Sequence, residues 1–109
     1  LAVLEALAVP MAALQATGAE NLAGKVLVDV ANPLDFSHGM PPFLDPAFTG
    51  TTSLGEQVQA AFPAAKVVKA FNTTGAENMA DSRYPGGSAF MPVCGDDAEA
   101  RQRVIALAT

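Results

Sequence analysis

The segments Lys25-Val-Leu-Val-Asp-Val30 and Lys66-Val-Val-Lys-Ala-Phe71 decide the fold of this chain of 109 residues. Both are short, rich in β-branched residues and almost continuously apolar, which is typical of strands buried on both faces of a parallel sheet. Between them, Ser53-Leu-Gly-Glu56 has the spacing of a capping box, in which the Ser hydroxyl accepts from the Glu N–H and the Glu carboxylate returns to the Ser N–H. We therefore predict strand, helix and strand in that order, joined by a right-handed crossover.

The later part of the chain extends this alternation. We predict a third strand over Ala89–Gly95, in which Pro92 has no N–H to donate and so favours an edge or a bulge. Cys94 is expected to be a small hydrophobe on this buried strand. Asp96 and Glu99 then indicate the start of a closing helix, with Asp96 as the capping acceptor. The apolar faces expected for the two helices are Leu54, Val58, Ala61 and Phe62, ended by Pro63, and Val104, Ile105 and Leu107.

The remaining segments are predicted to be helix ends, turns and loops. Pro10 disfavours helix at the residue before it and can open a new helix, so we expect a break there. Whether Leu1–Val9 is a helix or a buried strand stays open, because periodicity cannot decide such a short apolar run. Residues 31–52 hold four prolines and two glycines, which indicates a long irregular connection, of a kind that is usually functional or mobile. Gly75–Ala80 allows one or two helical turns, and Tyr84-Pro-Gly-Gly87 is a strong breaker.

The predicted fold class is α/β, a partial Rossmann-like doubly wound sheet of about three parallel strands with flanking helices. We expect residues 1–109 to form a single domain that is a piece of a larger one, because typical sheets have about four to six strands. The glycine-rich G-x-G-x-x-G turn that cradles a pyrophosphate does not occur among the nine glycines. This half of a nucleotide-binding domain is therefore expected to lack its own pyrophosphate cradle.

Composition excludes several classes of function. The formal net charge is −5 and the six Lys and Arg residues are dispersed, so the sequence offers no basic stripe to nucleic acid or to an anionic membrane surface. The one cysteine, Cys94, allows no internal disulfide and no cysteine-rich metal site. Leu1–Val9 is too short to span a membrane and lacks the flanks of a signal peptide, so we expect a cytoplasmic protein.

Two asparagines follow the two central strands. They lie in Val30-Ala31-Asn32-Pro33 and in Phe71-Asn72-Thr73-Thr74. Ligands of open parallel sheets bind beyond the carboxyl ends of the strands, and adjacent strands would bring both turns to one rim. A carboxamide donates and accepts at once, as does the carboxamide of nicotinamide or the edge of a flavin-type ring. The alternative is that Asn32 and Asn72 are turn residues that bond their own backbone.

Other polar residues have simpler interpretations. His38, the only histidine, lies in one loop with Asp35 and Ser37, whereas the members of a catalytic triad come from separate elements. We expect a solvated loop histidine and no metal site, because a lone histidine with scattered carboxylates has no ligand spacing. The Asp96-Asp97 pair is explained by helix capping. The sequence therefore indicates no catalytic acid, base or nucleophile.

Four segments, in this order, resemble the F420-dependent NADP oxidoreductase family and are also similar to the cytosolic domain of STEAP-type metalloreductases. They are Leu22-Ala-Gly-Lys-Val-Leu-Val-Asp-Val-Ala-Asn-Pro-Leu-Asp35, Ser53-Leu-Gly-Glu56, Ala65-Lys-Val-Val-Lys-Ala-Phe-Asn-Thr73 and Val93-Cys-Gly-Asp-Asp97. The resemblance covers about Leu22 to Thr109. It implies a Rossmann domain whose first half holds NADP(H), while loops after later strands border the nicotinamide and a second redox cofactor.

Carried onto this chain, the resemblance implies that Asn32, Pro33, Asn72 and Thr73 border the cofactor. It further implies direct hydride transfer between NADP(H) and a second cofactor such as F420 or flavin, with no protein acid or base. The glycine-rich turn would lie upstream of Leu1, so we expect residues 1–109 alone to be inactive, with a homo-oligomer or the missing N-terminal half as partner. The alternative is a non-catalytic regulatory or interaction module that pairs its open strand edge with another chain.

Overall fold

A three-stranded parallel sheet forms the centre of the computed structural model, which describes residues 2–4 and 10–109. Its strands are β1 (Ala2–Leu4), β2 (Val26–Asp29) and β5 (Lys66–Lys69), in the order β1-β2-β5. In the pairing of β2 with β5, Asp29 lies opposite Lys69. The α/β class is therefore confirmed, and the two strands predicted as central are adjacent and parallel.

The N-terminal segment that the sequence left open contributes β1 to this sheet, parallel to β2. Residues 1 and 5–9 lie outside the described part of the chain. The helix α1 (Pro10–Thr17) begins at the proline, as expected, because the missing N–H of a proline is not needed in the first turn of a helix.

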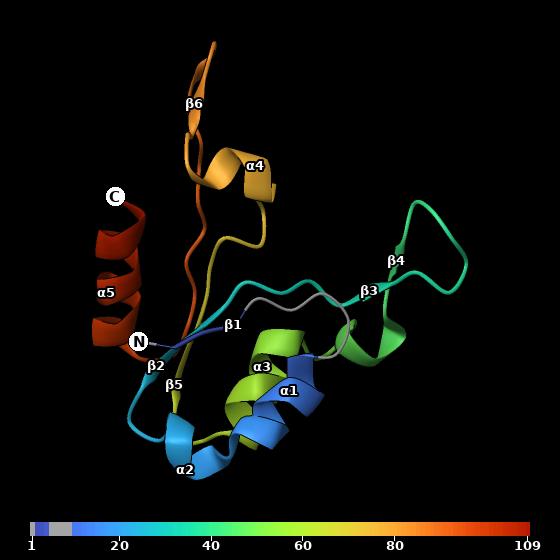
Figure 1. Ribbon diagram of the computed structural model, residues 1–109, viewed down its shortest axis with the longest axis vertical. Coiled ribbons are helices and arrows are strands. Elements are labelled where there is room, and N and C mark those ends of the chain that lie inside the picture. The colour runs from blue at the N-terminus through green and yellow to red at the C-terminus, as the bar shows by residue number, and fades with distance from the viewer. Residues whose placement is uncertain (1, 5–9) are drawn as a thin grey trace.

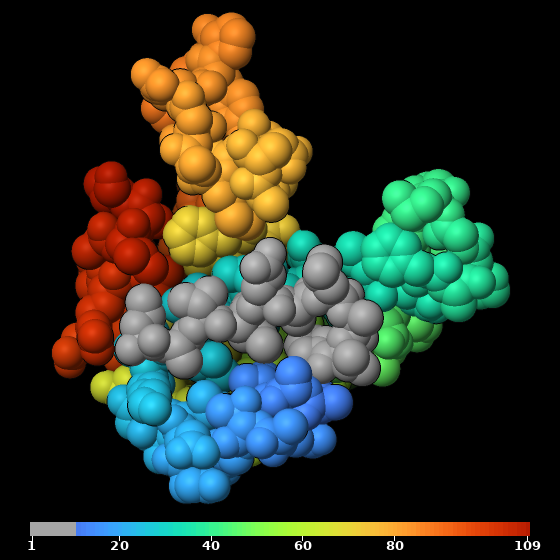
Figure 2. Space-filling view, in the orientation of Figure 1, coloured from blue at the N-terminus to red at the C-terminus, as the bar shows by residue number. Residues whose placement is uncertain are grey.

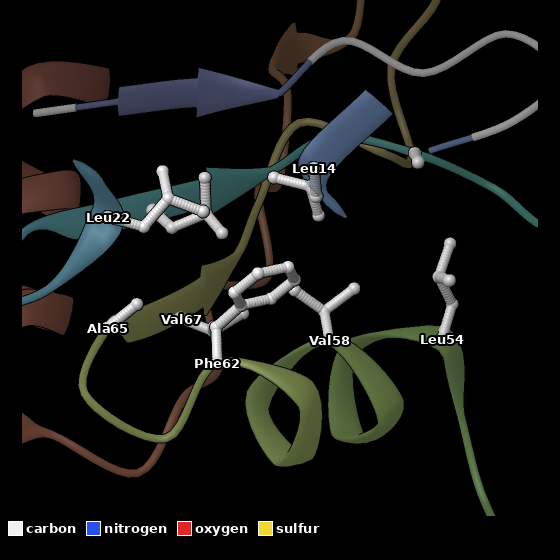
Figure 3. Close-up of a cluster of buried hydrophobic side chains, with 9 residues drawn as sticks. Leu14, Leu22, Leu54, Val58, Phe62, Ala65 and Val67 are labelled. Atoms are coloured by element: carbon white, nitrogen blue, oxygen red, sulfur yellow. The ribbon is translucent and has the colours of Figure 1, made fainter. Parts of the chain in front are cut away.

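Helices cover both faces of the sheet (Figure 1). The helices α1 and α3 (Leu54–Ala61) lie on one face, and α5 (Ala98–Ala108) lies on the other. Side chains alternate along β2, so that Leu27 packs toward α3 while Val26 and Val28 pack toward α5. The cluster on the α3 side, drawn in Figure 3, comprises Leu14, Leu22 (from α2, Ala19–Leu22), Leu27, Ala31, Leu54, Val58, Phe62, Ala65 and Val67.

Each face depends on a fully buried valine from its helix. Val58 of α3 and Val104 of α5 are both 0% exposed, and burying such a side chain contributes about 1.5–3 kcal/mol. The α5-side cluster comprises Val26, Val28, Val68, Ala70, Ala100 and Val104. These contacts explain why β2 and β5 are apolar along nearly their whole length.

Two antiparallel hairpins project from the body of the molecule (Figures 1 and 2). The first arm, residues 34–45, contains β3 (Leu34–Asp35) and β4 (Phe43–Leu44). The second arm, residues 82–90, contains β6 (Arg83–Tyr84) and β7 (Gly87–Ser88) around the predicted breaker. The first arm leads into a short 3-10 helix, η1 (Pro46–Phe48), and the second follows α4 (Ala76–Met79), which matches the helical turn expected over Gly75–Ala80.

The predicted third strand over Ala89–Gly95 is wrong. That segment makes one isolated antiparallel bridge, in which the N–H of Lys69 donates to the Cys94 carbonyl at 2.7 Å and the Cys94 N–H returns at 3.1 Å. Pro92 explains the short pairing, because it has no N–H to donate. Cys94 is exposed, so its expected role as a buried hydrophobe is wrong as well.

The helix starts are largely as expected, with one shift. The Ser53 hydroxyl accepts from the Glu56 N–H at 3.3 Å, which confirms this half of the predicted capping box. The cap of α5 is Asp97, which accepts from the Ala100 N–H at 2.7 Å; the expectation of Asp96 was wrong by one residue. Among the described helices, none has the length and apolar character that crossing a membrane requires.

The predicted apolar faces also need correction at three positions. Leu54, Val58 and Phe62 are buried as expected, but Ala61 is exposed. On α5, Val104 is buried together with Ala100, whereas Ile105 and Leu107 are exposed by 40% and 57%. With the cap at Asp97, the α5 positions 100 and 104 lie one turn apart on the face toward the sheet.

Candidate functional site

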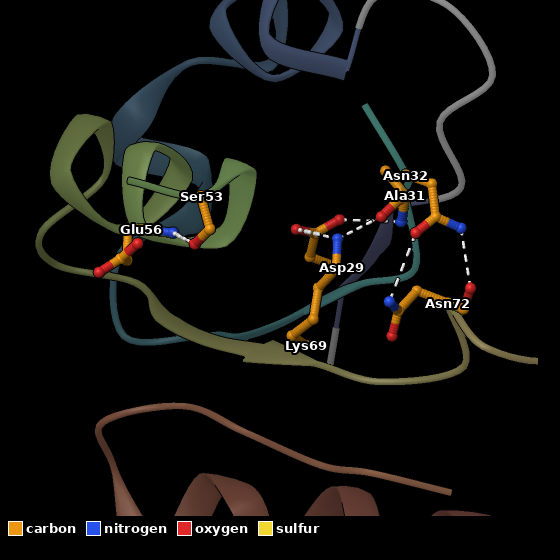
Figure 4. Close-up of polar contacts among 7 residues, drawn as sticks. All are labelled: Asp29, Ala31, Asn32, Ser53, Glu56, Lys69 and Asn72. Carbon is orange, nitrogen blue, oxygen red and sulfur yellow. Dashed lines mark hydrogen bonds and ion pairs between the residues drawn. The ribbon is translucent and has the colours of Figure 1, made fainter. Parts of the chain in front are cut away.

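The two asparagine turns meet at the carboxyl edge of the sheet (Figure 4). The Asn32 side-chain amide donates to the main-chain carbonyl of Asn72 at 2.8 Å, and the Asn72 amide donates to the Asn32 side-chain oxygen at 3.4 Å. Their proximity follows from the parallel pairing of β2 with β5. The sequence expectation that both turns share one rim is thereby confirmed.

A cavity of about 510 Å³ opens beside this pair. Ligand-binding pockets usually have volumes of about 300–1,000 Å³, so a flat ring with part of its substituents fits here. Of the residues expected at the site, Asn32, Pro33 and Asn72 line the cavity, whereas Thr73 is exposed and is not among the lining residues. The other lining residues are Phe48, Ser53, Leu54, Gly55, Glu56, Gln59, Val67, Lys69, Cys94, Gly95 and Asp96.

The turn after β5 has an unusual backbone. Phe71 has a φ of 63°, and it is the one residue other than glycine with a positive φ in the described part of the chain. Bulky residues rarely adopt this left-handed conformation, which costs of order 1–3 kcal/mol. The Phe71 N–H donates to the Met91 sulfur at 3.1 Å. The conformation turns the chain sharply at the end of the strand and brings Asn72 to the cavity.

An ion pair lies directly below the asparagines. Asp29, the last residue of β2, is 0% exposed, and Lys69, the last residue of β5, has a side chain that is 18% exposed. The Lys69 ammonium donates to the Asp29 carboxylate at 3.0 Å and also to the Ala31 carbonyl. The second Asp29 oxygen accepts from the Ala31 N–H at 2.9 Å.

Sequence reasoning did not single out this pair. A usable signal was present, because a charged residue in an otherwise apolar buried strand needs a partner, and Asp29 and Lys69 hold the same position on adjacent strands. The two central strands were treated as uniformly apolar, which concealed that signal.

The charges around the cavity favour a neutral ring over a phosphate. The charged residues among its lining are Lys69, Glu56 and Asp96, and the one cation is already bonded to Asp29. Arg and Lys groups that are free to contact phosphate are the usual means of binding anions. In this lining none is available, so the cavity suits the ring end of a dinucleotide better than its pyrophosphate.

The other candidates lie elsewhere. His38 is exposed in the first arm, where its ring meets Phe43 edge-on at 6.3 Å. The carboxyl groups of Asp35, Asp81 and Asp97 have a lowered pKa because nearby N–H groups or Arg83 donate to them, and none of the three lines the cavity. Within the described ranges, His, Cys, Asp and Glu side chains form no cluster of three or more that could hold a metal ion.

Comparison with known proteins identifies two similar chains, while no family model matches the sequence. A solved structure from Arthrobacter sp. FB24, described as a "putative F420 dependent NADP-reductase", is 57% identical with a TM-score of 0.84, over 92% of this chain and 45% of that chain. Metalloreductase STEAP3 of Rattus norvegicus is 34% identical over 90 residues, which are 83% of this chain and 16% of that protein.

These two matches confirm the resemblance that the sequence motifs predict. Both the reductase from Arthrobacter and the metalloreductase from rat were expected relatives by class. The chain spans less than half the length of either protein.

Proposed function

Because the chain is similar to an NADP-linked reductase along almost all of its length, we propose that it is the later half of a Rossmann-like, doubly wound domain that transfers hydride between NADP(H) and a second redox cofactor, such as F420 or flavin. The nicotinamide supplies the hydride when it is bound. The residues described here hold and orient the ring. The glycine-rich turn for the pyrophosphate belongs to a part of the domain outside this sequence.

The observation that carries this proposal is the asparagine pair at the rim of the cavity. Each carboxamide has two donors and two lone pairs, and their mutual bonds use only part of this capacity. The remaining donors and acceptors match the carboxamide of nicotinamide. Pro33 closes the rim beside Asn32, and Thr73 extends the rim on the solvent side of Asn72.

The test uses the ring end of the cofactor alone, so that the missing pyrophosphate cradle does not obscure the result. Reduced nicotinamide mononucleotide is added to the ¹⁵N-labelled chain, and the side-chain amide signals of Asn32 and Asn72 are followed by NMR. Both signals should shift. The amide of Asn21, which donates to the Thr17 carbonyl at 2.7 Å on the distant helix α2, should not.

Single substitutions then measure each contact. Asn32→Ala and Asn72→Ala should each weaken binding about tenfold, because a net hydrogen bond contributes about 0.5–1.5 kcal/mol. Asn21→Ala should leave the affinity unchanged. NADPH should bind only weakly, since its pyrophosphate meets no cradle in these residues. Micromolar NADPH binding that leaves the Asn32 and Asn72 signals unchanged would overturn the proposal.

A second candidate function is a non-catalytic interaction module, and the position of β1 favours it. β1 is an edge strand of the described sheet, with β2 as its one partner there. Exposed edges of this kind pair readily with other chains. Light scattering distinguishes the two functions: an association that strengthens with concentration supports the module, and a monomer at all concentrations contradicts it.

A further inference from the structure

We infer that Lys69 is a positioning residue, whose ammonium, held by the buried Asp29 carboxylate, sets the turn that presents Asn32 to the cavity. The inference rests on the proposed function for its meaning, since it explains how the ring-binding amide is kept in place. Its geometry stands on observations that do not involve any ligand.

The first observation is how completely the Asp29 carboxylate is used. It is 0% exposed, and one of its oxygens accepts from Lys69 while the other accepts from the Ala31 N–H. A buried carboxylate needs such partners because it has lost its hydration. Asp29 therefore holds Lys69 in a fixed place and at the same time fixes the start of the turn.

The second observation is that Lys69 contacts the other end of Ala31. The ammonium donates to the Ala31 carbonyl, so that residue is held at its N–H by Asp29 and at its carbonyl by Lys69 (Figure 4). This carbonyl belongs to the planar peptide group that joins Ala31 to Asn32. Its orientation therefore determines the direction in which the Asn32 backbone and side chain leave the strand.

The third observation is that stability alone is a weak reason for the pair. A buried ion pair can often be replaced by apolar residues of similar volume without loss of stability, whereas removal of one partner is harmful. The surface pair on the same strand, Lys66 with Asp97 at 3.4 Å, holds no turn and lies away from the asparagines. Lys69, in contrast, lines the cavity itself.

The test compares Lys69→Met with Lys66→Met, a matched change on the same strand. We expect Lys69→Met to shift the Asn32 side-chain amide signal in the ligand-free protein and to weaken binding of reduced nicotinamide mononucleotide about tenfold, because small misplacements of a binding group have large effects. Lys66→Met should leave both unchanged. Lys69→Arg, which keeps donors on a long side chain, should restore part of the affinity.

The double variant Asp29→Asn/Lys69→Met provides the result if Lys69→Met alone does not fold. It removes both charges and retains an acceptor for the Ala31 N–H, so the chain should fold while the Asn32 signal still shifts. An unchanged Asn32 signal in a folded variant without Lys69 overturns the inference. If that signal shifts but the unaltered protein binds no nicotinamide, the positioning role stands and the proposed function fails.

Discussion

Gly95 is a residue at which the backbone of one segment leaves no room for a side chain. A Cβ added there would lie 2.5 Å from the Val67 carbonyl oxygen and 3.3 Å from the Val68 Cα, and these backbone atoms cannot move aside. We expect Gly95→Ala to lower the free energy of unfolding by about 1–3 kcal/mol, in the range of overpacked cores. Urea denaturation measures the change.

The matched control for this prediction is Gly86→Ala. A Cβ at Gly86 meets nothing within 4 Å, and this glycine has no positive φ. Its unfolding midpoint should remain close to that of the unaltered protein. Equal midpoints for the two variants would show that the close approach of residue 95 to β5 does not exist in solution.

At the same scale, the sequence predicted the asparagines of the site but not the residues that hold them. Asn32 and Asn72 could be predicted because each follows a recognisable strand, and the carboxyl ends of neighbouring parallel strands meet. The Ala31 contacts of Lys69 could not be predicted, because they depend on the path of the turn after β2. Phe71 gave no signal either, since only the folded backbone reveals its positive φ.

Among the elements, the start of α5 makes a prediction about pH. The Ala100 N–H donates to the Asp97 carboxylate and, with Lys66 beside it, holds the pKa of Asp97 below its usual value. A lowered pKa stabilises the fold at pH values above the usual pKa of about 3.9, and this contribution disappears as the pH falls through the lowered value. Asp97→Ala should therefore lower the Tm at pH 7.

The control and the sign of this effect are both measurable. Asp96→Ala, at the residue that the sequence suggested as the cap, should leave the Tm nearly unchanged at pH 7. The Tm difference between the unaltered protein and Asp97→Ala should shrink on acidification below about pH 4, where the carboxylate becomes protonated. If Asp96→Ala has the larger effect at neutral pH, the assignment of the cap is wrong.

The helices and central strands were predictable as elements because their signals are local. Ser53 precedes α3 and Pro10 opens α1, and neither signal needs tertiary information. The predicted strand over residues 89–95 failed for the opposite reason. Its apolar character is compatible with a strand, but pairing depends on which N–H groups face β5, and here only Cys94 bridges to it.

The whole molecule carries more exposed apolar surface on its two arms than a sheet with two helical layers requires. In the first arm Phe36 is 50%, Met40 79% and Phe43 62% exposed, and in the second Phe90 is 85% exposed. Exposed apolar patches usually mark surfaces that interact with something. Both arms project from the part of the molecule that follows the carboxyl ends of β2 and β5 (Figures 1 and 2), which is also the side of the cavity.

Limited proteolysis with chymotrypsin tests how the arms relate to the cavity. The first cuts should fall after Phe36 or Phe43 and after Phe90, because the arms are exposed and few tertiary contacts hold them. Reduced nicotinamide mononucleotide should slow cleavage of the first arm, since Pro33 and Phe48 at its two ends line the cavity. Mass spectrometry over time follows each product.

The second arm is the internal control for this experiment, because none of residues 82–90 lines the cavity. Its cleavage should proceed at the same rate with and without the nucleotide, so that a general inhibition of the protease is recognised at once. Equal protection of both arms would mean that the nucleotide stabilises the whole fold and does not act through the base of the first arm. Protection confined to the first arm would place the ring between the asparagine pair and the connection that carries Phe48.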